Sequence, residues 1–178
     1  MADVKRIAIF GTESTGKTTL ARMLANHFEE PWAAEYVREY WDTHDGKIGP
    51  ADLDAIARGQ IANEETAAAR ARRVVFCDTE LMTCVLWNDL LFPGACPVWV
   101  RPEAEARARN FSLFLFCDTD VAFAPDPQRC FPDDARRIAA GKLWRDTLAQ
   151  RGLPWKQIAG GWPAREAAAI AAVKALLD

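Results

Sequence analysis

Short apolar runs alternate along the chain with longer amphipathic stretches. The runs are rich in β-branched and aromatic residues, and three of them are continuously apolar, which is typical of strands buried on both faces of a parallel sheet. The stretches between them are long enough for crossover helices, so the alternation predicts βαβ units and an α/β fold. The five predicted strands are Ile7–Phe10, Trp32–Ala34, Val74–Cys77, Leu113–Cys117 and Trp155–Ala159.

Six helices are predicted between and after these strands. Pro50 and Pro163 begin two of them, because proline is well tolerated in the first turn of a helix. The predicted helices are Thr18–Phe28, Pro50–Ala71, Leu81–Leu91, Arg101–Arg109, Asp134–Gln150 and Pro163–Leu177.

Two stretches, 43–49 and 118–133, have no such pattern. The second is longer than the roughly 12–15 residues beyond which loops are usually functional lids or disordered. It mixes Pro, Asp and Arg with Phe123 and Phe131, which is unusual for simple disorder. We therefore predict a lid over about residues 118–137, with an elaborate surface loop as the alternative.

Length and charge limit the classes of protein to which this chain can belong. Its 178 residues suit one domain, and a hydrophobic content of 50% argues against disorder. The 22 Lys+Arg and 25 Asp+Glu give a formal charge of −3, which disfavours a non-specific nucleic-acid binder. No apolar run approaches the roughly 18 residues of a membrane span. We expect no membrane partner and a cytoplasmic location.

The five cysteines, Cys77, Cys84, Cys96, Cys117 and Cys130, form no C-x-x-C pair, and several lie in apolar runs. They are predicted to be reduced, mostly buried thiols. Only two histidines accompany them, so a zinc site has few potential ligands.

One motif indicates specific chemistry. Residues 11–18 read G-T-E-S-T-G-K-T and match G-x-x-x-x-G-K-[ST], with a predicted strand before it and an amphipathic helix after it. In such a loop the backbone N–H groups surround phosphates, Lys17 bridges the β- and γ-phosphates, and the Thr18 hydroxyl binds Mg²⁺. The predicted nucleotide-binding residues are Gly11, Thr12, Glu13, Ser14, Thr15, Gly16, Lys17, Thr18 and Thr19.

The nucleotide is predicted to be ATP. Guanine-binding proteins normally carry an N-K-x-D element, and the chain has no string of that form. The predicted fold is therefore a three-layer P-loop NTPase fold, a five-stranded parallel sheet flanked by helices, with a lid.

Charged residues follow two further strands, at the edge where the carboxyl ends of parallel strands meet. Glu35 and Arg38 follow the second strand, and a solvated helix start is the alternative for both. Asp78 follows the third strand, where Mg²⁺ or its waters are commonly held. The alternative for Asp78, or for Thr79, is a helix N-cap.

Three segments together resemble NadR-type ribosylnicotinamide kinases, a family of P-loop nucleoside kinases. They are G-T-E-S-T-G-K-T-T, then A-E-Y-V-R-E-Y, then F-C-D-T-E-L-M-T. The resemblance runs from Ile7 to about Arg137. It also includes the lid, where Asp126-Pro127-Gln128-Arg129 is similar to the family's D-G-x-R.

The resemblance implies transfer of the ATP γ-phosphoryl group to the ribose 5′-hydroxyl of nicotinamide riboside, with ATP and Mg²⁺ as cofactors. Glu35 would orient the hydroxyl and take its proton. Asp78 would order the Mg²⁺ shell or hold the ribose. Arg38 would face the acceptor, and Arg129 and Arg136 would close over the transferring group. Tyr36 and Trp87 complete the predicted substrate site.

Two departures from the family concern the base. Ala34 stands where the best-known members have a ring-stacking aromatic, and Thr66 corresponds to a second such position. Replacement rings could come from Trp32, Tyr36, Tyr40, Trp41 or Trp87. A kinase of another nucleoside or small metabolite, and a regulatory ATPase module with no acceptor, therefore remain alternatives.

Overall fold

The protein is described here by a computed structural model covering residues 4–124, 126–131 and 133–178. A five-stranded sheet lies at its centre in the order β2-β3-β1-β4-β5, and every neighbouring pair is parallel. This confirms the predicted sheet, and each strand end lies within two residues of its predicted position. The strands are β1 (Lys5–Phe10), β2 (Trp32–Ala33), β3 (Val74–Asp78), β4 (Leu113–Cys117) and β5 (Trp155–Ile158).

The helices also follow the predicted pattern, with two differences. The helix predicted from Pro50 begins as a 3-10 turn and ends at Ala68, and α2 was not predicted as a helix. Only Tyr40 of α2 is buried, so an apolar period is hardly detectable in that sequence. The helices are α1 (Lys17–Phe28), α2 (Tyr36–Thr43), η1 (Pro50–Asp52), α3 (Leu53–Ala68), α4 (Leu81–Leu91), α5 (Val100–Ala108), α6 (Asp134–Gln150) and α7 (Trp162–Leu177).

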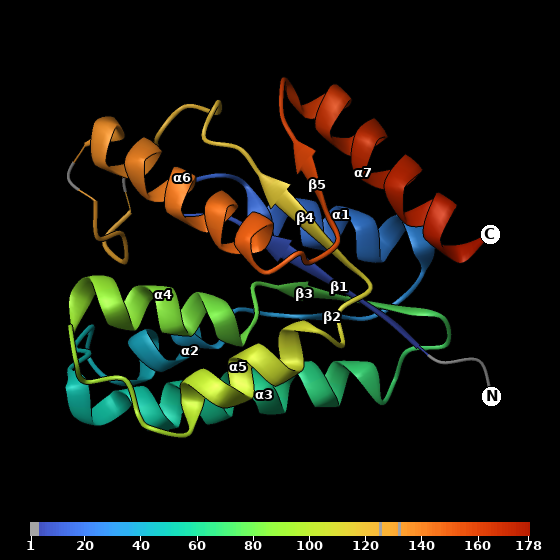
Figure 1. Ribbon diagram of the computed structural model, residues 1–178. Helices are drawn as coiled ribbons and strands as arrows, with labels where there is room; N and C mark the ends of the chain where they lie inside the picture. Colours follow the sequence, from blue (N-terminus) through green and yellow to red (C-terminus); the bar gives the residue numbers. More distant parts are fainter. Residues whose placement is uncertain (1–3, 125, 132) are drawn as a thin grey trace.

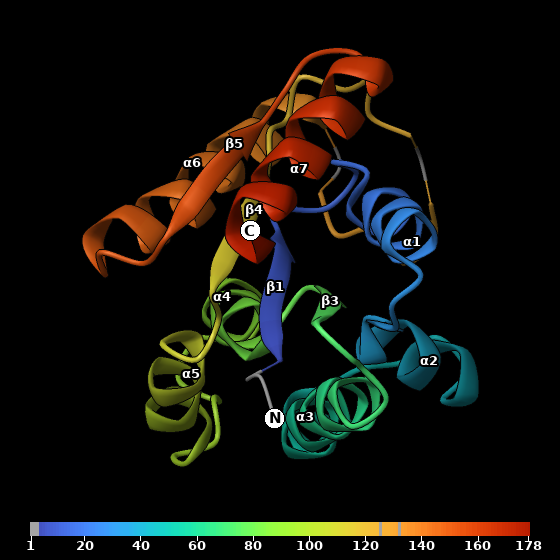
Figure 2. The same cartoon turned by 90° about the vertical axis from the view of Figure 1, so that its right-hand side faces the viewer.

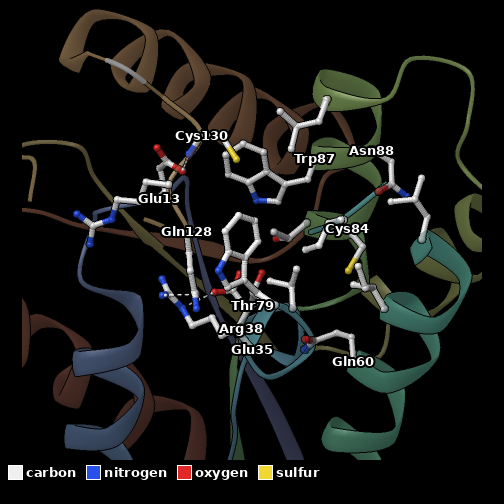
Figure 3. A pocket seen from close by; sticks show the side chains of 18 of the residues that line it. Glu13, Glu35, Arg38, Gln60, Thr79, Cys84, Trp87, Asn88, Gln128 and Cys130 are labelled. Atoms are coloured by element: carbon white, nitrogen blue, oxygen red, sulfur yellow. Dashed lines mark hydrogen bonds and ion pairs between the residues drawn. The ribbon is translucent and has the colours of Figure 1, made fainter. Parts of the chain in front are cut away.

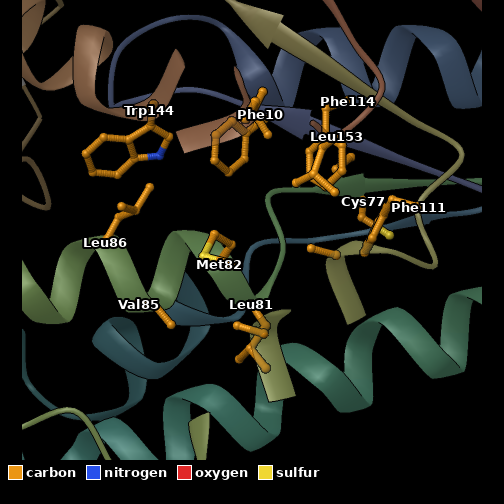
Figure 4. Packing of buried hydrophobic residues seen from close by; sticks show 14 of the residues in the cluster. Phe10, Cys77, Leu81, Met82, Val85, Leu86, Phe111, Phe114, Trp144 and Leu153 are labelled. Carbon is orange, nitrogen blue, oxygen red and sulfur yellow. The ribbon is translucent and has the colours of Figure 1, made fainter. Parts of the chain in front are cut away.

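Helices cover both faces of the sheet, because successive side chains of a strand point to opposite faces. Along β1, Ile7 and Ile9 pack with α1 and α7, whereas Ala8 and Phe10 pack with α4, α5 and α6. Figures 1 and 2 show these two layers with the sheet between them. In Figure 4, Phe10 lies between Trp144 of α6 and Phe114 of β4, over Met82 of α4. The three-layer α/β fold is confirmed.

The carboxyl ends of the strands lead into the segments that carry the predicted chemistry. The loop after β1 enters α1, β2 leads to α2, and β3 leads to α4. A long segment after β4 returns as α6 (Figure 1). In the described part of the chain, no helix is both long and apolar enough to cross a membrane.

Candidate active site

The loop between β1 and α1 adopts a conformation that depends on its glycines. Gly11 and Gly16 have φ angles of 147° and 81°, which side chains disfavour, and Gly16 is the N-cap of α1. The Lys17 ammonium donates to the carbonyl of Thr12 at 2.8 Å, and the Thr15 hydroxyl donates to the same carbonyl at 2.9 Å. The first N–H groups of α1 have no partner within the helix, so the loop is a ready anion site.

Two buried arginines donate hydrogen bonds to backbone carbonyl groups of this loop. Arg137 of α6 donates to the Ser14 carbonyl at 2.9 Å, and Arg165 of α7 donates to the Thr15 carbonyl at 3.3 Å; each residue is 1% exposed. The carbonyl and N–H groups of a peptide unit point in opposite directions, so fixing these carbonyls helps to orient the N–H groups. Sequence reasoning missed both residues, because an arginine on an Ala-rich helix resembles any surface arginine.

Thr18 and Asp78 meet where α1 and β3 come together. The Thr18 hydroxyl donates to one oxygen of the Asp78 carboxylate at 2.5 Å, and the other oxygen is buried with no partner among the described residues. Burial and the nearby Glu35 raise the pKa of Asp78 to about 6. Hydroxyl and carboxylate oxygens are the ligands that Mg²⁺ prefers, so this pair fits a magnesium ion bound together with nucleotide phosphates.

Glu35 and Arg38 meet at the start of α2. Arg38 donates to the Glu35 carboxylate at 3.1 Å and to the Gln128 side chain at 3.2 Å, and all three residues line the pocket (Figure 3). The backbone N–H of Tyr36 donates to Gln60 at 3.0 Å. The Tyr36 ring lies against Gly59 of α3, where an added Cβ would be 2.0 Å from the ring. Tyr36 therefore packs against α3 and does not line the pocket.

The lid segment (residues 118–137) is attached to the phosphate loop. The Glu13 carboxylate accepts hydrogen bonds from the N–H groups of Cys130 and Phe131, both at 2.8 Å. The Ser14 hydroxyl accepts a third from the N–H of Ala124, at 3.0 Å. These contacts bring the lid segment over the loop.

The two predicted lid arginines lie in different places. Arg129 lines the pocket, and its buried Nε and Nη1 have no partner within the described ranges, so it is available to an anionic ligand. The Arg136 side chain is 70% exposed and lies 3.8 Å from Asp133. The structure therefore does not bring Arg136 to the pocket. It points outward because it lies one residue before the buried Arg137, on a different face of α6.

A cavity of about 340 Å³ adjoins the phosphate loop. Its lining includes the charged side chains of Lys17, Glu35 and Arg129, and most of its wall is apolar. Two tryptophans, Trp41 of α2 and Trp87 of α4, contribute to that wall. The apolar part of the wall is formed by Val37, Trp41, Ile48, Leu53, Ile56, Cys84, Trp87, Leu91, Phe92 and Cys130.

The two positions at which the resemblance expects stacking rings, Ala34 and Thr66, lie away from the cavity. Both residues are exposed, and neither lines the cavity. Ala34 lies at the outer edge of the sheet, and Thr66 is on the solvent side of α3. Of the five replacement rings considered, Trp41 and Trp87 are the two that reach the cavity.

The residue that caps α4 was also not predicted. Glu80, and neither Asp78 nor Thr79, is the N-cap; its buried carboxylate accepts from the N–H groups of Met82 at 2.8 Å and Thr83 at 3.2 Å. Burial raises the pKa of Glu80 to about 8. Because Glu80 satisfies the helix end, Asp78 is left free to face Thr18.

Comparison with known protein families shows the family of this chain. The family model described as an AAA domain matches residues 6–165. The chain belongs to this family. The matched range contains every predicted site residue of this AAA-domain chain, from the phosphate loop to the start of α6.

Curated relatives carry a more specific name. The AAA-domain chain is 39% identical over 163 residues to the trifunctional NAD biosynthesis/regulator protein NadR of Salmonella typhimurium LT2, which covers 87% of this chain and 38% of the relative. The Escherichia coli K12 protein of the same name is 39% identical over 84 residues, covering 45% of this chain and 20% of the relative. The predicted resemblance to NadR is confirmed. The chain spans less than half the length of these relatives.

Solved structures show the same fold. A NadR protein in complex with NR has a TM-score of 0.75 and 22% identity to this AAA-domain chain, covering 98% of it and 52% of the other chain. A deoxyadenosine kinase from M. mycoides with bound dATP has a TM-score of 0.65 and 11% identity, covering 96% and 99%. At these identities the likeness shows the fold alone.

Proposed function

We propose that this chain is an ATP-dependent kinase that phosphorylates the ribose 5′-hydroxyl of nicotinamide riboside to give NMN. One observation carries the reaction type: the cavity adjoins the phosphate loop, and its lining includes both Lys17 and Glu35. An ATPase without an acceptor has no use for such a cavity. The 39% identity to NadR supports the choice of acceptor.

In the proposed mechanism the phosphate loop and Lys17 hold the triphosphate, while Thr18 and Asp78 would hold Mg²⁺. When bound, this ion would neutralise charge on the phosphate oxygens. Glu35 orients the acceptor hydroxyl at the mouth of the cavity and takes its proton. Arg38 holds Glu35 in position through their hydrogen bond of 3.1 Å. Thr19 completes the loop at the first turn of α1.

The lid segment completes the site. Arg129 lines the cavity and has two nitrogens without a partner among the described residues, and in this mechanism it stabilises charge on the transferring group. Glu13 keeps the lid segment over the loop, which excludes water from the γ-phosphoryl group. Excluding water favours transfer to the nucleoside over hydrolysis. The proposal places this reaction in the cytoplasm.

The proposal is tested by coupled ADP release with nicotinamide riboside, with other nucleosides and with water alone. Stimulation by nicotinamide riboside well above the water rate is expected. A higher rate with another nucleoside would favour the second candidate, a kinase of that nucleoside. This candidate is worth testing because the tryptophan rings of the cavity come from Trp41 and Trp87, whereas Ala34 and Thr66 lie outside it. A rate that no acceptor changes would indicate a regulatory ATPase.

Two variants test the assigned roles. Lys17→Ala is expected to abolish ATP-dependent activity with every acceptor. Glu35→Gln keeps the shape of the side chain and is expected to retain ATP binding while slowing transfer by about 10²–10⁴-fold. Undiminished transfer in Glu35→Gln would remove Glu35 from the mechanism.

A further inference from the structure

Two buried hydroxyls line the cavity without hydrogen-bond partners. Thr79 immediately precedes the N-cap of α4, and Thr83 lies in its first turn; they are 2% and 1% exposed. Both line the cavity, and neither hydroxyl has a partner among the described residues. Burying a polar group without a hydrogen bond is unfavourable, so these two hydroxyls call for an explanation.

Thr83 differs from two threonines that lie further along their helices, Thr43 and Thr147. In a helix, a threonine hydroxyl usually bonds the carbonyl four residues earlier. Thr147 does so to Leu143, and Thr43 does so to Glu39, each at 2.9 Å. Thr83 makes no such bond, because the residue four before it, Thr79, lies outside the helix; its backbone is fixed by the Glu80 cap, and its hydroxyl has no partner among the described residues. Its hydroxyl is therefore available to a molecule in the cavity.

Thr79 is held in a strained conformation. Its φ of 67° is a rare value for a β-branched residue, and its N–H donates to the Ile9 carbonyl at 3.0 Å. Such strain persists only where the surrounding structure imposes it, and it clusters at ligand-binding positions. Here the end of β3 and the Glu80 cap fix the residue on both sides.

The two threonines adjoin different parts of the predicted site. Thr79 directly follows Asp78 in the sequence and lines the cavity together with Lys17 and Glu35. Thr83 lies in the first turn of α4, and Trp87 follows one turn later on the same side of the helix. A nucleoside with its 5′-hydroxyl at Glu35 would place its sugar near Thr79 and its base near Thr83 and Trp87.

We propose that the Thr79 hydroxyl binds a hydroxyl of the acceptor sugar and that the Thr83 hydroxyl binds the polar edge of a planar base stacked against tryptophan. The inference rests on the proposed kinase function and defines its acceptor as a ribonucleoside whose base carries a hydrogen-bonding substituent such as a carboxamide. A hydroxyl both donates and accepts, so it suits either atom of a carboxamide.

Thr83→Val is the decisive variant, because valine keeps the shape of threonine and removes only the hydroxyl. With nicotinamide riboside we expect its kcat/KM to fall about tenfold, since a site built to hydrogen-bond a substrate group loses discrimination when that partner is removed. With pyridinium riboside, which lacks the carboxamide, the variant should match the unmodified protein. KM for ATP should not change, and Thr83→Ser should retain most of the activity.

Thr79→Val separates sugar recognition from base recognition. It retains β-branching, and hence the strain, but lacks the hydroxyl. Its kcat/KM is expected to fall by about the same factor with nicotinamide riboside and with pyridinium riboside. Thr79→Ser is the matched control and should retain activity with both.

Thermal unfolding distinguishes recognition from a structural role. Removing an unpartnered buried hydroxyl should leave the Tm of the free Thr83→Val protein unchanged or slightly raised. The Tm increase produced by nicotinamide riboside should shrink in the same variant. A lower Tm of the free variant, with the ligand-induced increase intact, would overturn the proposal.

The outcomes separate this inference from the proposed function. If the unmodified protein phosphorylates nicotinamide riboside but Thr83→Val keeps the same preference for it over pyridinium riboside, the inference on Thr83 fails and the kinase function stands. If the unmodified protein phosphorylates no nucleoside, the proposed function fails. Calorimetric binding of nicotinamide riboside that Thr83→Val weakens would then still support the site, and no binding would overturn it.

Discussion

The Thr18 hydroxyl donates a hydrogen bond of 2.5 Å to the Asp78 carboxylate, joining the start of α1 to the end of β3. Replacing Thr18 by Ala removes one proposed oxygen ligand of Mg²⁺ and the hydrogen bond that orients the other. We expect the Mg²⁺ concentration that gives half the maximal rate to rise by about 10–100-fold. ADP release measured against Mg²⁺ at fixed ATP tests this. Thr18→Ser retains the hydroxyl and should titrate like the unmodified protein; an unchanged titration in Thr18→Ala would contradict the assignment.

The contact between Glu13 and the lid segment predicts a change in lid opening. Glu13→Ala removes the acceptor of two hydrogen bonds from Cys130 and Phe131. Hydrogen bonds to a charged group contribute about 1.5–3 kcal/mol each, so protease cleavage within the lid segment should accelerate at least about tenfold. Ser14→Ala removes a single neutral contact, that from Ala124, and should accelerate cleavage less. Equal cleavage rates for Glu13→Ala and the unmodified protein would show that the lid segment is held by other contacts.

Trp162 packs closely on Gly16, so we expect substitutions at these two positions to have coupled effects on the free energy of unfolding. A Cβ at Gly16 would lie 2.5 Å from Cη2 of Trp162, and the φ of 81° is unfavourable for alanine. Gly16→Ala should therefore lower the free energy of unfolding by more than the roughly 1–2 kcal/mol that the backbone conformation alone costs. The part due to the clash should disappear when Trp162→Ala is added.

A double-mutant cycle of Gly16→Ala and Trp162→Ala, followed by urea unfolding, measures this coupling. Strictly additive losses would mean that the indole moves aside without cost.

The sheet and the phosphate loop could be predicted because both depend on local patterns. Continuous apolar runs such as Val74–Cys77 define buried strands whatever their neighbours are. The glycines and Lys17 of the loop occupy a spacing that the backbone geometry itself requires. For the same reason Asp78 could be placed correctly, because the end of β3 must face the loop.

Contacts between distant segments could not be predicted. Arg137 and Arg136 are adjacent in the sequence, yet only Arg137 is buried against the loop, 123 residues from Ser14. Which of two neighbouring arginines points inward depends on the angle at which α6 lies on the sheet. Five rings were candidates for the cavity wall, and it is the packing of α2 and α4 that brings Trp41 and Trp87 to it.

The ion pairs of Glu65 predict a pH dependence of stability. Its carboxylate accepts from Arg6 at 2.7 and 3.0 Å and from Arg107 at 2.5 Å, linking α3 to β1 and α5. The hydrogen bonds from Arg6, followed by the one from Arg107, lower the pKa of Glu65 from 4.5 to about 2. A lowered carboxyl pKa stabilises the folded state above the ordinary pKa, and this contribution is lost as the pH falls from 4.5 toward 2.

Glu65→Gln should therefore lower the free energy of unfolding by up to about 1 kcal/mol at pH 7, as expected for a partly exposed pair. The difference from the unmodified protein should be constant above about pH 5.5 and shrink below pH 4.5. Urea unfolding of both proteins at pH 7, 5 and 3.5 measures it. Asp146→Asn, at the exposed pair with Arg145, is the matched control and should change stability less. A Glu65→Gln difference that stays constant down to pH 3.5 would show that the carboxylate charge is not the stabilising element.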